Sequence, residues 1–140
     1  MTRPLVLRAV PGSVAVCRLD ADAPHSDDVL RAIVSSRAPL VSVTLTAAEL
    51  SIVCPTDLAP AGARVEGPWL AFAVDGTLDV ALVGILVRLT TPLASAGISV
   101  FAISTFGTDY LLVPAASADG AVRAWLAAGI GVVDQDAAPG

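Results

Sequence analysis

The sequence predicts an α+β protein made of two tandem units of ferredoxin-like order, β-α-β-β-α-β. In each unit we expect an antiparallel sheet with helices on one face, and we expect the first unit to be reduced. Three observations support this prediction. The 140 residues are 55% hydrophobic and 15% charged, which suits helices packed on sheets. Strand-like alternation and helical spacing follow one another along the second half of the chain, and parts of that pattern recur in the first half.

The first half contains the elements of the reduced unit. The stretch RPLVLRAVPG predicts a short strand and a Pro-Gly turn, and SVAVCRL predicts a second strand. Ser26 is the expected N-cap of a short helix, with Asp27 and Asp28 at its positive end. Two strands, LVSVTLT and ELSIVC, follow with a tight Ala-Ala connection. In the Pro- and Gly-rich stretch PTDLAPAGARVEGP, the second helix is expected to be shortened.

The second half has the full β-α-β-β-α-β order. The strand WLAFAV ends in a DGT turn, and Asp79 is expected to cap a long helix. Apolar residues at intervals of three and four give this helix one core-facing stripe. We expect Pro92 to kink the helix and Gly97 to close it. The strands ISVFAIS and DYLLVP, a helix capped by Ser117 and a final strand GVV complete the unit.

Short motifs recur between the two halves. VSV at 41–43 recurs as ISV at 98–100, and LSIVCP recurs as YLLVP. Each pair of motifs flanks a predicted hairpin, which favours a tandem duplication. The expected organisation is an N-terminal unit over residues 1–62, a C-terminal unit over residues 63–134 and a frayed tail over residues 135–140.

Charge and hydropathy exclude several classes of partner. The net charge is −5 and the eight basic residues are scattered arginines, so no basic patch for nucleic acid is expected. Residues 89–108 carry no charge and are long enough to span a bilayer, but Pro92, two glycines and seven Ser or Thr residues argue against a membrane segment. Arg8 and Pro11 interrupt the N-terminal apolar run, which excludes a signal peptide. We therefore expect a cytoplasmic protein without a membrane partner.

The residues that usually carry chemistry are isolated in this sequence. Cys17 and Cys54 lie in strand-like runs outside any CxxC pair, so we expect buried, unreactive thiols. The single histidine, His25, lies in a polar loop. No Ser-His-Asp or Cys-His arrangement, metal-ligand set, phosphate-binding loop or dinucleotide fingerprint is evident. The sequence thus predicts no enzyme activity, no metal and no cofactor.

Two stretches, VSVTLTAAELSIVCP and DGTLDVALVGILVRLTTPLASAGISVFAISTFGTDYLLV, resemble the ACT domain family. The resemblance is to small two-ACT proteins related to the cytosolic arginine sensor (CASTOR-like ACT pairs). It covers most of residues 38–128, and PLASAGISVFAISTFGTDYLLV is its most specific part. The resemblance implies a non-catalytic regulatory protein that binds an amino acid at an interface between ACT units. Free strand edges and apolar helix faces favour a homodimer, and regulation implies a protein partner.

The resemblance and the residue chemistry together define a candidate ligand site. An amino acid presents a carboxylate, an ammonium group and a side chain, so its site needs donors, acceptors and an apolar wall. Asp109 is the expected counter-charge and Phe106 the wall; in the sensor family, the positions matching these residues and Thr105 lie at the ligand. The candidate ligand-binding residues are Ser104, Thr105, Phe106, Thr108, Asp109, Gly76, Thr77, Leu78, Asp79, Gly84, Ser42 and Val43.

These residues also have plainer structural interpretations. Asp109 suits a turn cap, Asp79 a helix N-cap and Gly84 close helix packing. The first unit's hairpin reads TAAE instead of STFGTD, so we expect one ligand site per chain. At the level of the whole protein, the alternatives are an interaction module without a ligand and a small enzyme.

Overall fold

A computed structural model describes residues 4–23, 26–75 and 84–134. The chain forms two compact units. The inserted unit comprises Gly12–Trp69, and the split unit comprises Met1–Pro11 and Leu70–Gly140. The boundary expected between residues 62 and 63 would place the N-terminal strand in the first unit, whereas this strand packs in the split unit.

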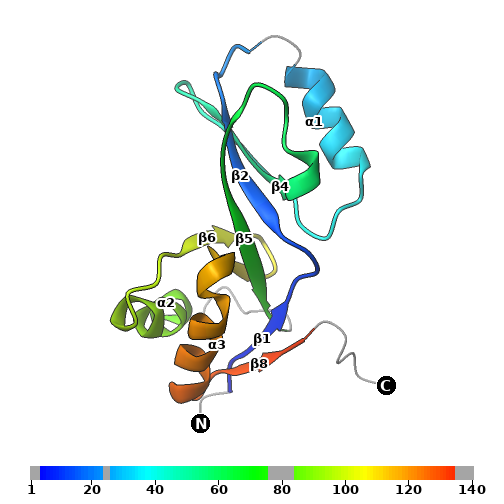
Figure 1. The fold of residues 1–140 in the computed structure, drawn as a ribbon. Helices are drawn as coiled ribbons and strands as arrows, with labels where there is room; N and C mark the ends of the chain where they lie inside the picture. Colours follow the sequence, from blue (N-terminus) through cyan, green and yellow to red (C-terminus); the bar gives the residue numbers. More distant parts are fainter. Residues whose placement is uncertain (1–3, 24–25, 76–83, 135–140) are drawn as a thin grey trace. The chain divides into compact units, whose positions relative to one another are not determined.

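The inserted unit has the ferredoxin-like order with a shortened second helix (Figure 1). Its strands follow the order β3-β4-β2-β5, and each neighbouring pair is antiparallel. Its elements are β2 (Val14–Leu19), α1 (Ser26–Ser35), β3 (Ser42–Leu45), β4 (Leu50–Pro55), the 3-10 helix η1 (Thr56–Leu58) and the first part of β5 (Arg64–Val74). Its buried core consists of Ala15, Cys17, Ile33, Leu50, Ile52 and Cys54.

Pro60 explains why the second helix of the inserted unit is so short. The residue before a proline is pushed away from the α-helical region, and Ala59 accordingly has a ψ of 129°. In the split unit, the corresponding Ala118 has a ψ of −43° and a full helix begins there. The shortened helix expected from the sequence is thus confirmed as a single 3-10 turn.

The first part of β5 was missed in the sequence because Gly67 and Pro68 read as turn residues. The strand instead continues through this pair, which is joined by a cis peptide bond. A Cβ atom added to Gly67, whose φ is 150°, would lie 3.2 Å from the Val14 carbonyl oxygen and 3.3 Å from Trp69 Cδ1. Glycine therefore permits the close approach of β2 and β5, where the register between the two strands shifts.

The split unit has the complete ferredoxin-like order and one additional strand. The additional strand, β1, pairs antiparallel with β5 and parallel with β8, so the order is β6-β7-β5-β1-β8. Its elements are β1 (Val6–Ala9), the second part of β5, α2 (Ile85–Ser95), β6 (Phe101–Ser104), β7 (Asp109–Pro114), the 3-10 helix η2 (Ala115–Ser117), α3 (Ala118–Ala127) and β8 (Gly131–Val133).

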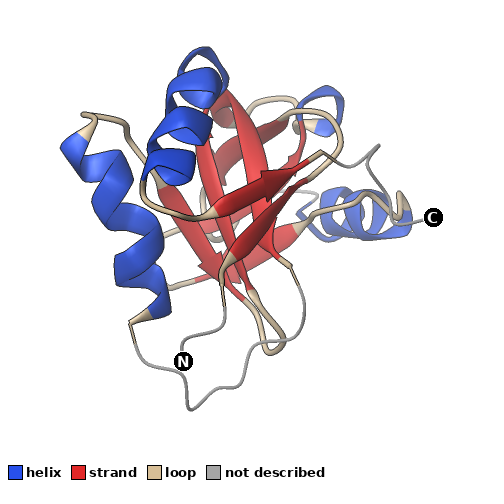
Figure 2. Cartoon of the chain, turned by 90° about the horizontal axis from the view of Figure 1, so that it is seen from below, coloured by secondary structure: helices blue, strands red, loops and turns tan. Residues whose placement is uncertain are grey.

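Helices α2 and α3 cover one face of the split unit's sheet. Figure 1 shows the two helices side by side, and Figure 2 shows helices in blue against strands in red. Trp125 of α3 is fully buried, and its indole Nε1–H donates to the Leu89 carbonyl of α2 at 2.8 Å. The rings of Trp125 and Phe72 meet edge-on, with their centroids 5.0 Å apart. The core also contains Leu5, Leu7, Val74, Leu89, Leu93, Leu111, Val113, Ala118, Ala121 and Ile130.

Glycines end both helices of the split unit in the same way, as expected for Gly97 and Gly129. Each glycine has a positive φ, and the residue after it donates its N–H to a carbonyl in the last turn. In α2 this bond joins the Ile98 N–H to the Leu93 oxygen at 2.9 Å. The expected strand ISVFAIS therefore begins only at Phe101, because the first residues after the helix complete its C-cap.

The starts of the split unit's two helices agree only in part with the expected caps. Gly84, in a left-handed conformation, is the N-cap of α2, and Asp79, the expected cap, lies outside the described residues. Ser117 is the N-cap of α3, but its side chain makes no capping hydrogen bond. No described helix has the length and apolar character needed to cross a membrane.

Candidate functional site

The β6–β7 hairpin of the split unit repeats the β3–β4 hairpin of the inserted unit. Both have the same strand register, with Ser42 opposite Val53 in one and Phe101 opposite Leu112 in the other. Both lead directly into a three-residue 3-10 helix. Phe101 lies 59 positions after Ser42, so the motif comparison of VSV with ISV is shifted by two residues. The comparison of LSIVCP with YLLVP agrees with this register.

The turns of the two hairpins have the same hydrogen bonds. In the split unit, the Thr105 N–H donates to the Thr108 carbonyl at 2.9 Å, and Thr105 Oγ1 accepts the Gly107 and Thr108 N–H groups at 3.3 and 3.2 Å. In the inserted unit, Thr46 makes the matching bonds within the sequence TAAE. The hydroxyl of Thr105 is therefore a feature of the shared turn, and turn chemistry accounts for it.

The two hairpins differ at the residue pair below the turn. In the split unit this pair is Ser104 and Asp109, and the serine Oγ lies 2.6 Å from Asp109 Oδ1. In the inserted unit the matching pair is Leu45 and Leu50. Leu50 is only 2% exposed and belongs to the core. A carboxylate in the split unit thus replaces a core leucine of the inserted unit.

Asp109 lies on the helix-covered face of the split unit's sheet. Leu111 and Val113 of the same strand pack in the core beneath α2 and α3, and alternate residues of a strand share a face. Asp109 is half-buried at the end of this row. It is therefore an acidic group at the margin of an apolar core, where a ligand with a cationic group and an apolar body would be complementary.

Two further contacts organise the same end of the split unit. Thr108 Oγ1 donates to the Val74 carbonyl at 2.9 Å, which ties the hairpin to the end of β5. Asp75, the next residue of the chain, accepts two bonds from Arg8 of β1, at 3.2 and 3.3 Å. The sequence placed Asp75 in the DGT turn but did not predict its arginine partner.

The other predicted site residues are distributed as follows. Phe106 lies at the hairpin tip and is 96% exposed. Within the described part of the split unit, its ring is therefore not the wall of a pocket, as the sequence had suggested. Gly84 precedes α2 and is exposed, whereas the sequence placed it one turn inside the helix. Ser42 and Val43 belong to β3 of the inserted unit. The loop residues Gly76, Thr77, Leu78 and Asp79 lie outside the described residues.

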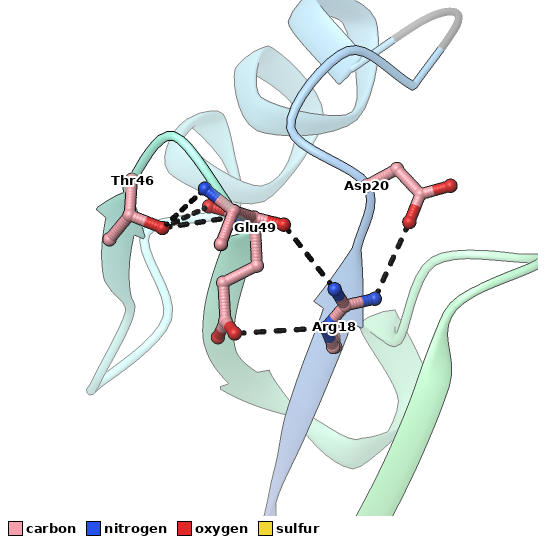
Figure 3. Close-up of polar contacts among 5 residues, drawn as sticks. Arg18, Asp20, Thr46 and Glu49 are labelled. Carbon is pink, nitrogen blue, oxygen red and sulfur yellow. Dashed lines mark hydrogen bonds and ion pairs between the residues drawn. The ribbon is translucent and has the colours of Figure 1, made fainter.

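An arginine-centred cluster in the inserted unit was not predicted from the sequence (Figure 3). The Arg18 guanidinium lies 3.4 Å from Asp20 Oδ1 and 3.7 Å from Glu49 Oε2, and it donates to the Ala48 carbonyl at 3.3 Å. It joins the end of β2 to the β3–β4 turn. The sequence signal available for it is an aspartate directly after a strand, Asp20 after β2 and Asp75 after β5.

The two cysteines are buried in the inserted unit, as expected. Burial raises the pKa of the Cys17 thiol, and burial together with the neighbouring Cys17 raises the pKa of Cys54 to about 12. Both groups are therefore protonated and unreactive at neutral pH. Among the residues that the structure describes, no group of three or more His, Cys, Asp or Glu residues is arranged to hold a metal ion.

Comparisons with known proteins agree with this architecture. Residues 64–125 match the ACT domain family model. The crystal structure of protein Atu0741 from Agobacterium tumefaciens is similar over 96% of both chains, with 30% sequence identity and a TM-score of 0.82. No match to a curated protein was found. The family-model match places an ACT domain over residues 64–125 of the chain.

More distant structures share the fold. Protein VC0802 from Vibrio cholerae, described as a possible transport protein, has 20% identity and a TM-score of 0.69, and the match covers 89% of this chain and 90% of that one. The regulatory subunit of aspartate kinase from Thermus thermophilus has 13% identity and a TM-score of 0.61, with 84% and 93% of the two chains covered. At these identities the likeness shows the ferredoxin-like ACT fold alone.

Proposed function

We propose that this chain is a non-catalytic regulatory protein that binds a free amino acid beside the β6–β7 hairpin. The observation that carries the proposal is the Ser104–Asp109 pair, which stands where the repeated hairpin has Leu45 and Leu50. A duplicated fold tolerates a leucine at this place, so stability does not require the carboxylate. A ligand that donates to Asp109 supplies a reason for it.

The chemistry of Asp109 favours an amino acid with a cationic or strongly polar group. Ser104 donates to one carboxylate oxygen, and an ammonium or guanidinium group is the natural donor for a half-buried carboxylate. The adjoining core of Leu111 and Val113 offers apolar surface for the ligand's aliphatic part. We also propose the backbone N–H groups of the loop Gly76 to Asp79, which lies outside the described residues, as partners for the ligand carboxylate.

The family supports a regulatory role for the whole chain. One protein of similar fold is the regulatory subunit of aspartate kinase from Thermus thermophilus. By analogy, ligand binding would favour one state of the chain and so report to a protein partner. Four expectations from the sequence stay predictions. They are a closer relation to arginine-sensor ACT pairs, a cytoplasmic location, ligand contacts from Ser42 and Val43, and closure of the site by another ACT unit.

A screen of thermal stability against the twenty amino acids tests the proposal. The expected result is a rise in Tm with one chemical class of amino acid, because a ligand bound to the folded state stabilises it. Asp109→Asn should abolish this rise while keeping the shape of the side chain. Asp20→Asn is the matched control, since it removes an exposed carboxylate in the inserted unit and should leave the response intact.

The outcomes separate the candidate functions. A response that survives Asp109→Asn overturns the proposed site. If no amino acid changes the Tm of the well-folded protein, an interaction module without a ligand becomes the better explanation. The fully exposed Phe106 at the hairpin tip favours that second function, because an exposed aromatic side chain is a frequent anchor in protein interfaces.

A further inference from the structure

Cys17 and Cys54 form a pair of thiols inside the inserted unit. In the ladder between β2 and β4, Cys17 lies opposite Ile52 and Cys54 lies opposite Ala15, so the two cysteines are diagonal neighbours on adjacent strands. Both belong to the same core cluster, and they are only 1% and 0% exposed. Their thiol groups hydrogen-bond to each other. The fold thus brings two oxidisable groups together from strands that are distant in the sequence.

The repeated hairpin shows that packing does not require a thiol at Cys54. The matching residue of β7 is Val113, since the two hairpins share their register and a proline follows each of these residues. Val113 is as fully buried as Cys54. A valine therefore satisfies the fold at this place, whereas the inserted unit has a group that can be oxidised.

We propose that Cys17 and Cys54 are a redox-responsive pair, which a peroxide converts into a disulfide between β2 and β4. In the first step the Cys17 thiolate attacks a peroxide oxygen. An S–O bond forms, the O–O bond breaks, and the leaving hydroxide takes up the thiol proton as water. In the second step Cys54 Sγ attacks the sulfur of this sulfenic acid, the S–S bond forms, the S–O bond breaks and a second water leaves. The two thiols are oxidised by two electrons, and the peroxide is reduced to two waters.

The surroundings of the two thiols decide which one reacts first. Burial raises the pKa of both, but the hydrogen bond with Cys54 favours the Cys17 thiolate. The negative charge of Asp57 adds to the rise in the pKa of Cys54. Cys17 is therefore the thiol that meets the peroxide, and Cys54 is the one that closes the disulfide. Because the thiolate is a minor species at neutral pH, the pair responds to sustained exposure.

The diagonal placement makes the oxidation reversible. Diagonal neighbours in a sheet are farther apart than residues directly opposite one another, so a disulfide between them draws β2 and β4 out of their regular spacing. Strained disulfides are more easily reduced than relaxed ones. A dithiol reductant therefore restores the two thiols. The proposal does not depend on amino-acid binding.

Mass spectrometry of the folded full chain in hydrogen peroxide gives the readout. We expect a product lighter by two hydrogen atoms, formed over hours, that dithiothreitol reverses. Trypsin cleaves after Arg18, Arg37 and Arg64 and so separates the two cysteines. A non-reduced digest should therefore contain residues 9–18 linked to residues 38–64. Circular dichroism before and after oxidation verifies that the chain stays folded.

Single variants test the order of the two steps. Cys54→Val introduces the residue of the repeat and should stop the reaction at the Cys17 sulfenic acid, which dimedone captures. Cys17→Ala should be modified roughly tenfold more slowly, because the remaining thiol is the less readily ionised one. Neither variant should give the linked peptides. If one of them fails to fold, the other and the wild-type digest keep the test valid.

Two results would overturn the proposal. The first is a folded wild-type chain that keeps both thiols through long exposure to peroxide, while the chain in urea forms the disulfide. The second is an oxidised chain that contains sulfinic acids or disulfides between chains in place of the internal link. A dimedone adduct in Cys17→Ala and none in Cys54→Val would overturn the assigned order of the two thiols.

Discussion

Ser104 Oγ lies 2.6 Å from Asp109 Oδ1 across the β6–β7 hairpin, at the place where the β3–β4 hairpin has Leu45 opposite Leu50. The turns above these pairs are the same, and the 3-10 helices after them occupy the same positions. The duplicated hairpins therefore allow the effect of the polar pair on stability to be measured separately from the effect of the hairpin fold.

Exchanging the residue types between the hairpins should have unequal effects on stability. Leu50→Asp should lower the free energy of unfolding by at least about 4 kcal/mol, because it places a charge in a closed core. Asp109→Leu should change it by less than about 1 kcal/mol, since Asp109 is half-buried and leucine suits this position in the repeat. Urea unfolding measures both. A loss of several kcal/mol in Asp109→Leu would show that the carboxylate serves the fold.

The threonines that close the two turns should contribute alike. Thr46→Ala and Thr105→Ala each remove a hydroxyl that accepts two backbone N–H groups. We expect each to cost about 0.5–1 kcal/mol, because the groups are exposed and water replaces part of the loss. Serine at either position retains the hydroxyl and should restore most of the stability. A loss of ligand response in Thr105→Ala without any loss of stability would instead assign the hydroxyl to the ligand.

The Trp125 indole should stabilise the split unit through both its ring and its N–H. Trp125→Phe retains most of the buried ring but leaves the Leu89 carbonyl without the indole donor, and should cost about 1–3 kcal/mol. Trp125→Ala should cost about 3–5 kcal/mol because it also opens a cavity. Chemical denaturation followed by far-UV circular dichroism measures both changes. Equal losses in the two variants would assign the whole effect to the hydrogen bond.

The buried thiols should make stability fall in alkaline solution. The pKa of Cys54 is about 12 in the folded chain, against an ordinary value of 9.0. The unfolded chain therefore releases this proton at lower pH than the folded chain. The stabilisation is complete below pH 9 and is lost as the pH rises towards 12.

Urea unfolding at a series of pH values measures this dependence. The double variant Cys17→Ala and Cys54→Ala should be less stable at neutral pH but have a flatter profile above pH 9. The native thiols should also resist alkylation at pH 8 and react once the chain is unfolded. Rapid alkylation of the folded chain would contradict the burial of the pair.

Much of the fold could be predicted from the sequence because it depends on local signals. The hairpin strands, the C-terminal helix and the glycines that end both helices follow from apolar spacing and from the conformational freedom of glycine. Pro60 marks the place where the second helix of the inserted unit stops. The strand β5 was only half predicted, because Gly67 and Pro68 are turn residues in most contexts.

The candidate site was predicted only as a set of residues along the chain. The STFGTD hairpin was recognised, but Thr105 and Thr108 use their hydroxyls within the hairpin and against Val74. The pairing of Arg8 with Asp75 joins residues 67 positions apart. No local pattern predicts such a contact, since it depends on which strands become neighbours.

The sequence by itself determined the α+β class, the duplication and the acidic hairpin residue, because each of these depends on residue types at short spacing along the chain. Only the tertiary structure decided that β1 belongs with the C-terminal unit and that Asp109 occupies a core-leucine position. It also showed that β3 ends the inserted unit's sheet among the described strands. These facts depend on strand pairing between distant segments, which hydrogen bonds and burial select once the whole sheet forms.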